Sequence, residues 1–157
     1  MRARMALLTS GIEVELREVE LCDVPAEMTR ISPKATVPVL QLENGDVIDE
    51  SRDIIDWSVG QRDPLGWGNT RDDAQVAALI DSNDHDFKSH LDRYKYSDRH
   101  PEHSPDKYRG DAEAFLCDLE SRLQQSRYLI ADQCSAADIA IFPFILVVSK
   151  FSKNVSQ

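Results

Sequence analysis

The stretch ATVPVLQLENGDVIDES, residues 35–51, decides the fold. Its apolar run 37–42 predicts a strand, and residues 47–48 predict a returning strand. Asn44-Gly45 between them is a strong two-residue hairpin signal, because both residue types tolerate positive φ. Ser51 follows the returning strand and can cap a helix that carries the next apolar residues. The stretch therefore predicts an antiparallel hairpin that leads directly into a helix.

The residues before this stretch extend the pattern. Residues 1–10 predict a helix that ends at Gly11, with Arg2 and Arg4 as surface charges. Apolar residues then alternate over 12–16, which predicts a strand. Residues 25–31 predict one or two helical turns. The expected order in residues 1–60 is helix, strand, short helix, hairpin and helix, which is an α/β arrangement.

The second half of the chain is expected to be all-helical. The segment 61–69, QRDPLGWGN, has no periodicity and predicts a linker. A capping box is expected at Thr70 and Asp73, followed by an apolar stripe over 77–94. Ser104-Pro105 predicts the start of another helix. We therefore expect two domains, at 1–60 and 70–157, joined by residues 61–69.

A last helix is predicted after Ser135. Ser135 and Asp138 have the spacing of a capping box, and the apolar run 139–148 behind them predicts a helix that is buried on all sides. Pro143 should kink this helix, because it removes an interior hydrogen bond. The run has ten residues, and a helix that spans a membrane needs about 20, so no membrane span is expected.

Composition excludes several classes of function. The net charge of −10 argues against binding to nucleic acid or to anionic membranes, both of which require clustered Lys and Arg. Three cysteines without a C-x-x-C motif, and no leader at Met1, predict buried or half-buried, inert thiols and a cytoplasmic location. The four histidines match no zinc spacing, so no metal is expected.

Glu50 and Ser51 suit an α-amino acid head group. Backbone N–H groups at the start of a helix bind a carboxylate, and the Ser51 hydroxyl adds a donor. The Glu50 carboxylate can bind an ammonium group beside it. The alternative is that the two residues only cap the helix.

Two residues of the second half are candidates for a substrate cleft. Asp84 lies on the apolar face of its helix and either lines such a cleft or makes a local hydrogen bond. Tyr94 either faces the cleft or packs in the core.

Three short motifs, taken in their order along the chain, resemble the pattern of the glutathione S-transferase family. They are Val-Pro at 37–38, Glu-Ser at 50–51 and S-x-x-D at 135–138. The resemblance implies a thioredoxin-like first domain and an all-helical second domain. It implies that Val37, before a cis-proline at Pro38, binds the cysteinyl backbone of glutathione, and that Glu50 and Ser51 hold its γ-glutamyl end. Lys34 is implied as a contact to the glycyl carboxylate, with a solvated loop lysine as the alternative.

The resemblance also implies what the chain does. Family members bind glutathione as co-substrate and transfer it to a small electrophile, or exchange thiols, in detoxification, and they are usually homodimers. The family carries a strand and an activating Ser, Tyr or Cys ahead of the first helix, so the catalytic group is expected before Met1 and the chain is expected to be truncated at both ends. Two functions stay open: a transferase, or a catalytically silent binding or regulatory protein of the same fold, including a non-functional gene fragment.

Overall fold

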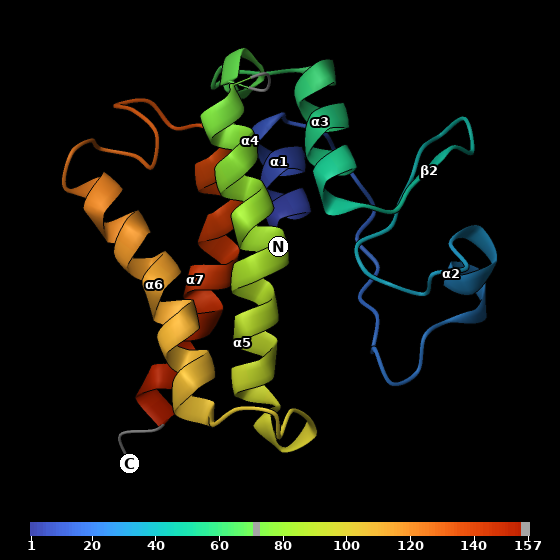
Figure 1. The fold of residues 1–157 in the computed structure, drawn as a ribbon. Coiled ribbons are helices and arrows are strands. Elements are labelled where there is room, and N and C mark those ends of the chain that lie inside the picture. The colour runs from blue at the N-terminus through green and yellow to red at the C-terminus, as the bar shows by residue number, and fades with distance from the viewer. Residues whose placement is uncertain (71–72, 155–157) are drawn as a thin grey trace. The chain divides into compact units, whose positions relative to one another are not determined.

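The computed structural model describes residues 1–70 and 73–154. The chain forms two compact units, Met1–Gly68 and Asn69–Gln157 (Figure 1). The first unit contains α1 (Arg2–Thr9), α2 (Ala26–Ile31), β1 (Leu40–Gln41), β2 (Val47–Ile48) and α3 (Ser51–Gln61). A 3-10 helix at Trp67–Thr70 follows. The second unit contains α4 (Ala74–Asp81), a π-helical turn (Ser82–Phe87), α5 (Lys88–Lys95), a 3-10 helix (Ser97–Arg99), α6 (Pro105–Leu123) and α7 (Ala136–Asn154).

The first unit is organised by the packing of α1 against α3. Gly11 ends α1 as predicted: its φ of 65° lies in the left-handed region, and the Ile12 N–H returns to the Leu7 carbonyl at 3.0 Å. The core is small and apolar. Its buried members are Ala3, Leu7 and Ile54, and the half-buried Ile12, Leu40, Ile48 and Trp57 pack against them.

The predicted hairpin is present, with a longer turn than expected. β1 and β2 pair antiparallel with Leu40 opposite Ile48 and Gln41 opposite Val47. This register leaves residues 43–45 as a three-residue connection. The Gly45 N–H returns to the Leu42 carbonyl at 2.9 Å, and Gly45 has a φ of 92°. A turn followed by a left-handed glycine is the usual three-residue hairpin, so the predicted two-residue turn is wrong by one residue.

The strand predicted over 12–16 is absent from the structure. Residues 12–19 form no regular element, and Val14 and Leu16 are exposed. Alternation gives one face of a strand, but the strand also needs a neighbour to pair its backbone groups. In the described ranges 1–70 and 73–154, the sheet has two strands, β1 and β2, and neither pairs with this segment.

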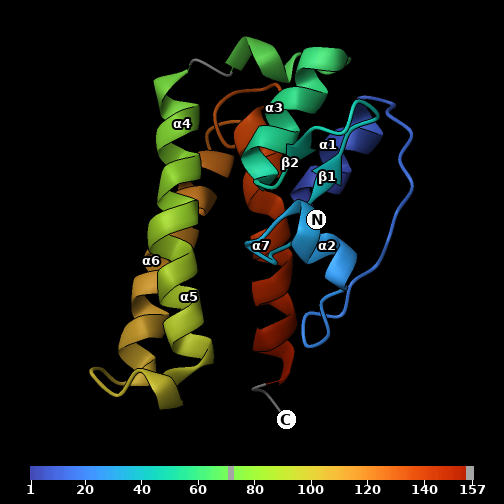
Figure 2. The same ribbon diagram turned by 90° about the vertical axis from the view of Figure 1, so that its right-hand side faces the viewer.

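The second unit is a set of packed helices. α4, the π-helical turn and α5 follow one another as one continuous rod, with α6 against α5 and α7 against α4 (Figures 1 and 2). The rings of Phe87 and Phe115 stack with centroids 4.8 Å apart. The buried core consists of Val76, Leu79, Ile80, Leu119, Leu129, Ala137, Ala140 and Ile141.

One of the predicted helix starts in the second unit differs in the structure. α4 begins at Ala74 with Asp73 as its N-cap, whose carboxylate accepts from the Gln75 N–H at 2.8 Å, so the capping box predicted from Thr70 is wrong. Ser104 caps α6 as predicted. A π-helical turn lies within the segment 77–94, yet the members of its expected apolar stripe are buried or half-buried, with Ile80 and Phe87 buried on either side of the turn.

Two other expectations about exposure are wrong. Phe142 is exposed, so α7 is not buried on all sides. Cys22 and Cys117 are exposed thiols, and Cys134 is half-buried. α7 continues through Pro143, and the kink expected there stays a prediction. The helices within the described residues contain none that is long and apolar enough to cross a membrane.

Ile54→Val tests the core of the first unit. Ile54 is almost fully buried between α1 and α3, so we expect removal of one methyl group to lower the free energy of unfolding by about 1 kcal/mol. Both tryptophans, Trp57 and Trp67, lie in this unit, so their fluorescence during urea denaturation reports on it. Val14→Ala is the control, because Val14 is exposed and should change the midpoint little. Equal effects of the two variants would contradict this assignment of the core.

Candidate ligand-binding site

The candidate site lies where the hairpin ends and α3 begins. β2 ends at Ile48, and two residues later Glu50 occupies the N-cap position of α3 with extended backbone angles. The Glu50 side chain makes no capping hydrogen bond, and Ser51 is the first residue inside the helix. Ser51 as the cap of this helix is therefore a wrong prediction.

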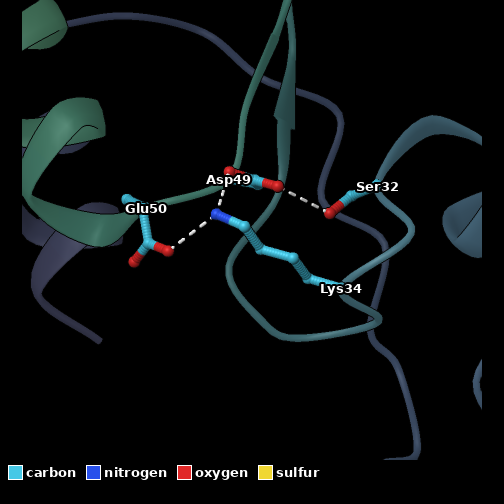
Figure 3. A network of polar contacts seen from close by, with 4 residues as sticks. All are labelled: Ser32, Lys34, Asp49 and Glu50. Atoms are coloured by element: carbon cyan, nitrogen blue, oxygen red, sulfur yellow. Dashed lines mark hydrogen bonds and ion pairs between the residues drawn. The ribbon is translucent and has the colours of Figure 1, made fainter.

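A polar network joins the loop after α2 to the end of the hairpin (Figure 3). The Lys34 ammonium lies 3.0 Å from Asp49 Oδ1 and 2.9 Å from Glu50 Oε1. The hydroxyl of Ser32, which is 1% exposed, donates to Asp49 Oδ2 at 2.8 Å. Asp49 thus holds the loop and the hairpin together, and Lys34 lies against the carboxylate that was predicted to bind an ammonium group.

The network shifts the titration of its own members. Hydrogen bonds to Glu50 and then Asp49 raise the pKa of Lys34. The hydrogen bonds from Lys34 and then Ser32 lower the pKa of Asp49. The contribution of Asp49 to stability is therefore present above its usual pKa and is lost as pH falls through the lowered value. The contribution of Lys34 to stability is lost only as pH rises through the raised pKa of Lys34. The network is intact at neutral pH.

Val37 and Pro38 lie beside this network in the chain. The Val37–Pro38 peptide bond is cis. The ladder of the hairpin begins at Leu40, so the backbone groups of Val37 lie outside it, and the Val37 side chain is half exposed. The backbone of Val37 is therefore not committed to the sheet.

Arg2 is the residue of the site that the sequence did not indicate. Its Nε–H donates to the Ser51 hydroxyl oxygen at 2.9 Å. Arg2 is 8% exposed, which corrects the expectation that it is a surface charge. Arg4, two residues along α1, is exposed and pairs with Glu18 at 2.9 Å. No local signal separates the two arginines, because the partner of Arg2 lies 49 residues away in the chain.

The remaining predicted residues lie in the second unit. Asp84 is in the π-helical turn, where its Oδ1 accepts a hydrogen bond from Asn83 Nδ2 at 2.9 Å. Tyr94 is half-buried on α5. A substrate-binding role for either residue stays a prediction. Over residues 1–70 and 73–154, no group of three or more His, Cys, Asp and Glu side chains has an arrangement that could hold a metal ion.

Comparison with known proteins identifies the family of this chain. Residues 1–65 match the family model described as Glutathione S-transferase, N-terminal domain. Residues 85–157 match the model described as Glutathione S-transferase, C-terminal domain. The chain belongs to the glutathione S-transferase family. This confirms the family predicted from the motifs at 37–38, 50–51 and 135–138.

Solved structures of glutathione S-transferases resemble this family member. A class Gtt2 enzyme of Vibrio parahaemolyticus is 26% identical, with a TM-score of 0.71 over 92% of this chain and 74% of its own. Glutathione S-transferase 1-6 from Anopheles dirus species B is 21% identical, with a TM-score of 0.75 over 96% of this chain and 75% of its own. A glutathione S-transferase-I bound with the ligand lactoylglutathione is 21% identical, with a TM-score of 0.68 over 88% of this chain and 72% of its own. No curated protein matches the sequence.

The family match and the observed architecture confirm the predicted fold class. A first unit with a small sheet and a helical second unit is the glutathione S-transferase fold, with a thioredoxin-like domain followed by an all-helical one. Within the described part of the chain, the sheet of the first unit has two strands.

Proposed function

We propose that this glutathione S-transferase family member binds glutathione at the start of α3. The observation that carries the proposal is that Glu50 and Ser51 are adjacent at this helix N-terminus and that the Glu50 side chain makes no capping hydrogen bond. A carboxylate beside a hydroxyl at a helix start matches an α-amino acid, whose ammonium and carboxylate share one carbon. The γ-glutamyl end of glutathione carries this head group.

The rest of the peptide is assigned to the turn before β1. An extended peptide is recognised through main-chain hydrogen bonds, and the Val37 backbone lies outside the hairpin ladder. We therefore assign the cysteinyl backbone of glutathione to Val37, with Pro38 shaping the turn. The structural neighbour that was solved with lactoylglutathione shares the fold and supports a glutathione-type ligand here.

The proposed activity is transfer of glutathione to a small electrophile. The glutathione thiol gives its proton to solvent, the thiolate attacks an electrophilic carbon, and a leaving group departs with the bonding electrons. Glu50, Ser51 and Val37 supply binding and orientation in this scheme and do not touch the sulfur. Homodimer formation, a cytoplasmic location and a role in detoxification belong to the same proposal, and light scattering at several protein concentrations tests the first of them.

Calorimetric titration with glutathione tests the binding proposal. We expect saturable binding at one site, and at least about tenfold weaker binding of cysteinylglycine, which lacks the γ-glutamyl group. A folded chain that shows no saturable binding at millimolar glutathione would refute the proposal. Chloride release from chlorodinitrobenzene then separates the two functions left open by the sequence: turnover above the uncatalysed rate supports a transferase, and binding without turnover supports a silent binding protein.

Lys34→Met decides the role of Lys34. Its ammonium holds the same Glu50 carboxylate that is assigned to the ligand ammonium, so the two positive charges repel each other. We expect the variant to bind glutathione about twofold to fivefold more tightly at low ionic strength. The gain should shrink in about 0.5 M salt, because the site is exposed and salt screens such charges. Weaker binding by the variant would instead assign Lys34 to the glycyl carboxylate. Lys107→Met, an exposed lysine in the second unit, is the control.

A further inference from the structure

Arg2 is a charged side chain that is almost fully buried in the first unit. It is 8% exposed, and its Nε–H donates to the Ser51 oxygen at 2.9 Å. α1 packs against α3, which brings the second residue of the chain to the first residue of α3. Arginine side chains are seldom buried to this extent.

The direction of this hydrogen bond determines what the Ser51 hydroxyl can do. A serine hydroxyl has one O–H donor and two acceptor lone pairs, whereas a guanidinium group only donates. The Arg2 Nε–H therefore takes a lone pair of Ser51, and the Ser51 O–H must point away from Arg2. Among the described residues, no group accepts a hydrogen bond from this O–H. Ser51 is half-buried, so its O–H can donate to a group that arrives from solvent.

The start of α3 acts in the same direction. Helix N-termini attract anions through their N–H groups and through the helix dipole. The Ser51 hydroxyl lies at this helix start, where Ser51 is the first residue of α3. The oriented hydroxyl and the helix N-terminus both favour a carboxylate at Ser51.

We propose that Arg2 is a positioning residue that orients the Ser51 hydroxyl toward the α-carboxylate of the γ-glutamyl group. This inference rests on the proposed glutathione site and assigns it a residue that acts through Ser51. A residue that merely ties α1 to α3 would affect every ligand of the site equally. A residue that acts on the carboxylate affects only ligands that carry it.

The test compares two ligands and a set of variants by calorimetry. The ligands are glutathione and γ-aminobutyryl-cysteinylglycine, which keeps the ammonium and lacks the α-carboxylate. Arg2→Met should weaken glutathione binding about tenfold and binding of the analogue less than about twofold. Arg2→Lys, which keeps an N–H donor, should restore glutathione binding to within about threefold of the wild type. Arg4→Met is the matched control on the same helix and should change neither affinity.

A Ser51→Ala background shows whether Arg2 acts through the hydroxyl. In that background, Arg2→Met should weaken glutathione binding at most about threefold, because the hydroxyl that it orients is gone. A full tenfold effect there, or an equal loss for both ligands in the Arg2→Met single variant, would overturn the inference. Circular dichroism checks that each variant is folded.

The wild-type chain alone provides a test that needs no folded variant. If the analogue binds as tightly as glutathione, the α-carboxylate is not recognised. The role of Arg2 and the assignment of Ser51 to the carboxylate are then refuted, while glutathione binding by the chain stands. If neither ligand binds, the proposed function itself fails. At least about tenfold preference for glutathione over the analogue supports both the proposed glutathione site and recognition of the α-carboxylate. The variants then assign this preference to Arg2.

Discussion

We expect Asp138→Ala to lower the free energy of unfolding of the second unit by at least about 3 kcal/mol. The carboxylate accepts from the Leu129 N–H at 2.9 Å, the Ser135 N–H at 2.8 Å and the Ser135 hydroxyl at 2.7 Å. Ser135 is 1% exposed and Leu129 is buried, so water cannot easily replace the lost acceptor. Each buried donor left without a partner costs about 1–3 kcal/mol.

This contact is more than the capping box predicted from the sequence. The Ser135 hydroxyl donates to Asp138 instead of capping the helix, and the Leu129 N–H comes from the segment between α6 and α7. Asp138 therefore fixes the segment before α7 as well as the start of α7 itself. Its loss should loosen both, which makes the expected effect larger than the loss of a helix cap alone, typically about 1 kcal/mol.

Urea denaturation followed by circular dichroism measures this effect. Asp132→Ala is the matched control, because Asp132 lies in the same segment, is exposed, and accepts one backbone hydrogen bond from Arg127 at 3.1 Å. We expect it to change the free energy of unfolding by less than about 1 kcal/mol. Asp138→Asn keeps one acceptor oxygen and should fall between the two. An Asp138→Ala variant as stable as the Asp132→Ala control would show that the three hydrogen bonds do not hold this region.

The second large effect is expected at the ligand site. Glu50→Gln and Ser51→Ala should each weaken glutathione binding about tenfold, and the double variant about a hundredfold. Glu50→Gln removes the charge that is assigned to the ligand ammonium, and Ser51→Ala removes the donor that is assigned to its carboxylate. The two residues are adjacent, so the combined loss can depart from the product of the single losses.

Folding and charge are controlled separately in this experiment. Glu43→Gln makes the same charge change on the exposed hairpin turn and should leave glutathione affinity unchanged. Fluorescence of Trp57 and Trp67, both in the first unit, verifies that each variant is folded. A folded double variant that binds glutathione as the wild type does would remove Glu50 and Ser51 from the site.

Elements with local signals were predictable from the sequence. Gly11 and the apolar residues before it located α1, and the turn at Asn44-Gly45 located the hairpin. Their signals lie within a few residues of each other, and local backbone preference is enough to produce them. The strand expected at 12–16 failed for the opposite reason, since a strand requires hydrogen bonds from a second segment.

The sequence by itself determined the family, the predicted fold class and the placement of Glu50 and Ser51 at the start of a helix. These follow from short motifs whose order along the chain is visible without coordinates. Only the tertiary structure decided which side chains meet there. It placed Lys34 on Asp49 and Glu50, and it buried Arg2 against Ser51. These contacts join residues 15 to 49 positions apart, and the packing of α1 and the hairpin around α3 sets them, which no local propensity specifies.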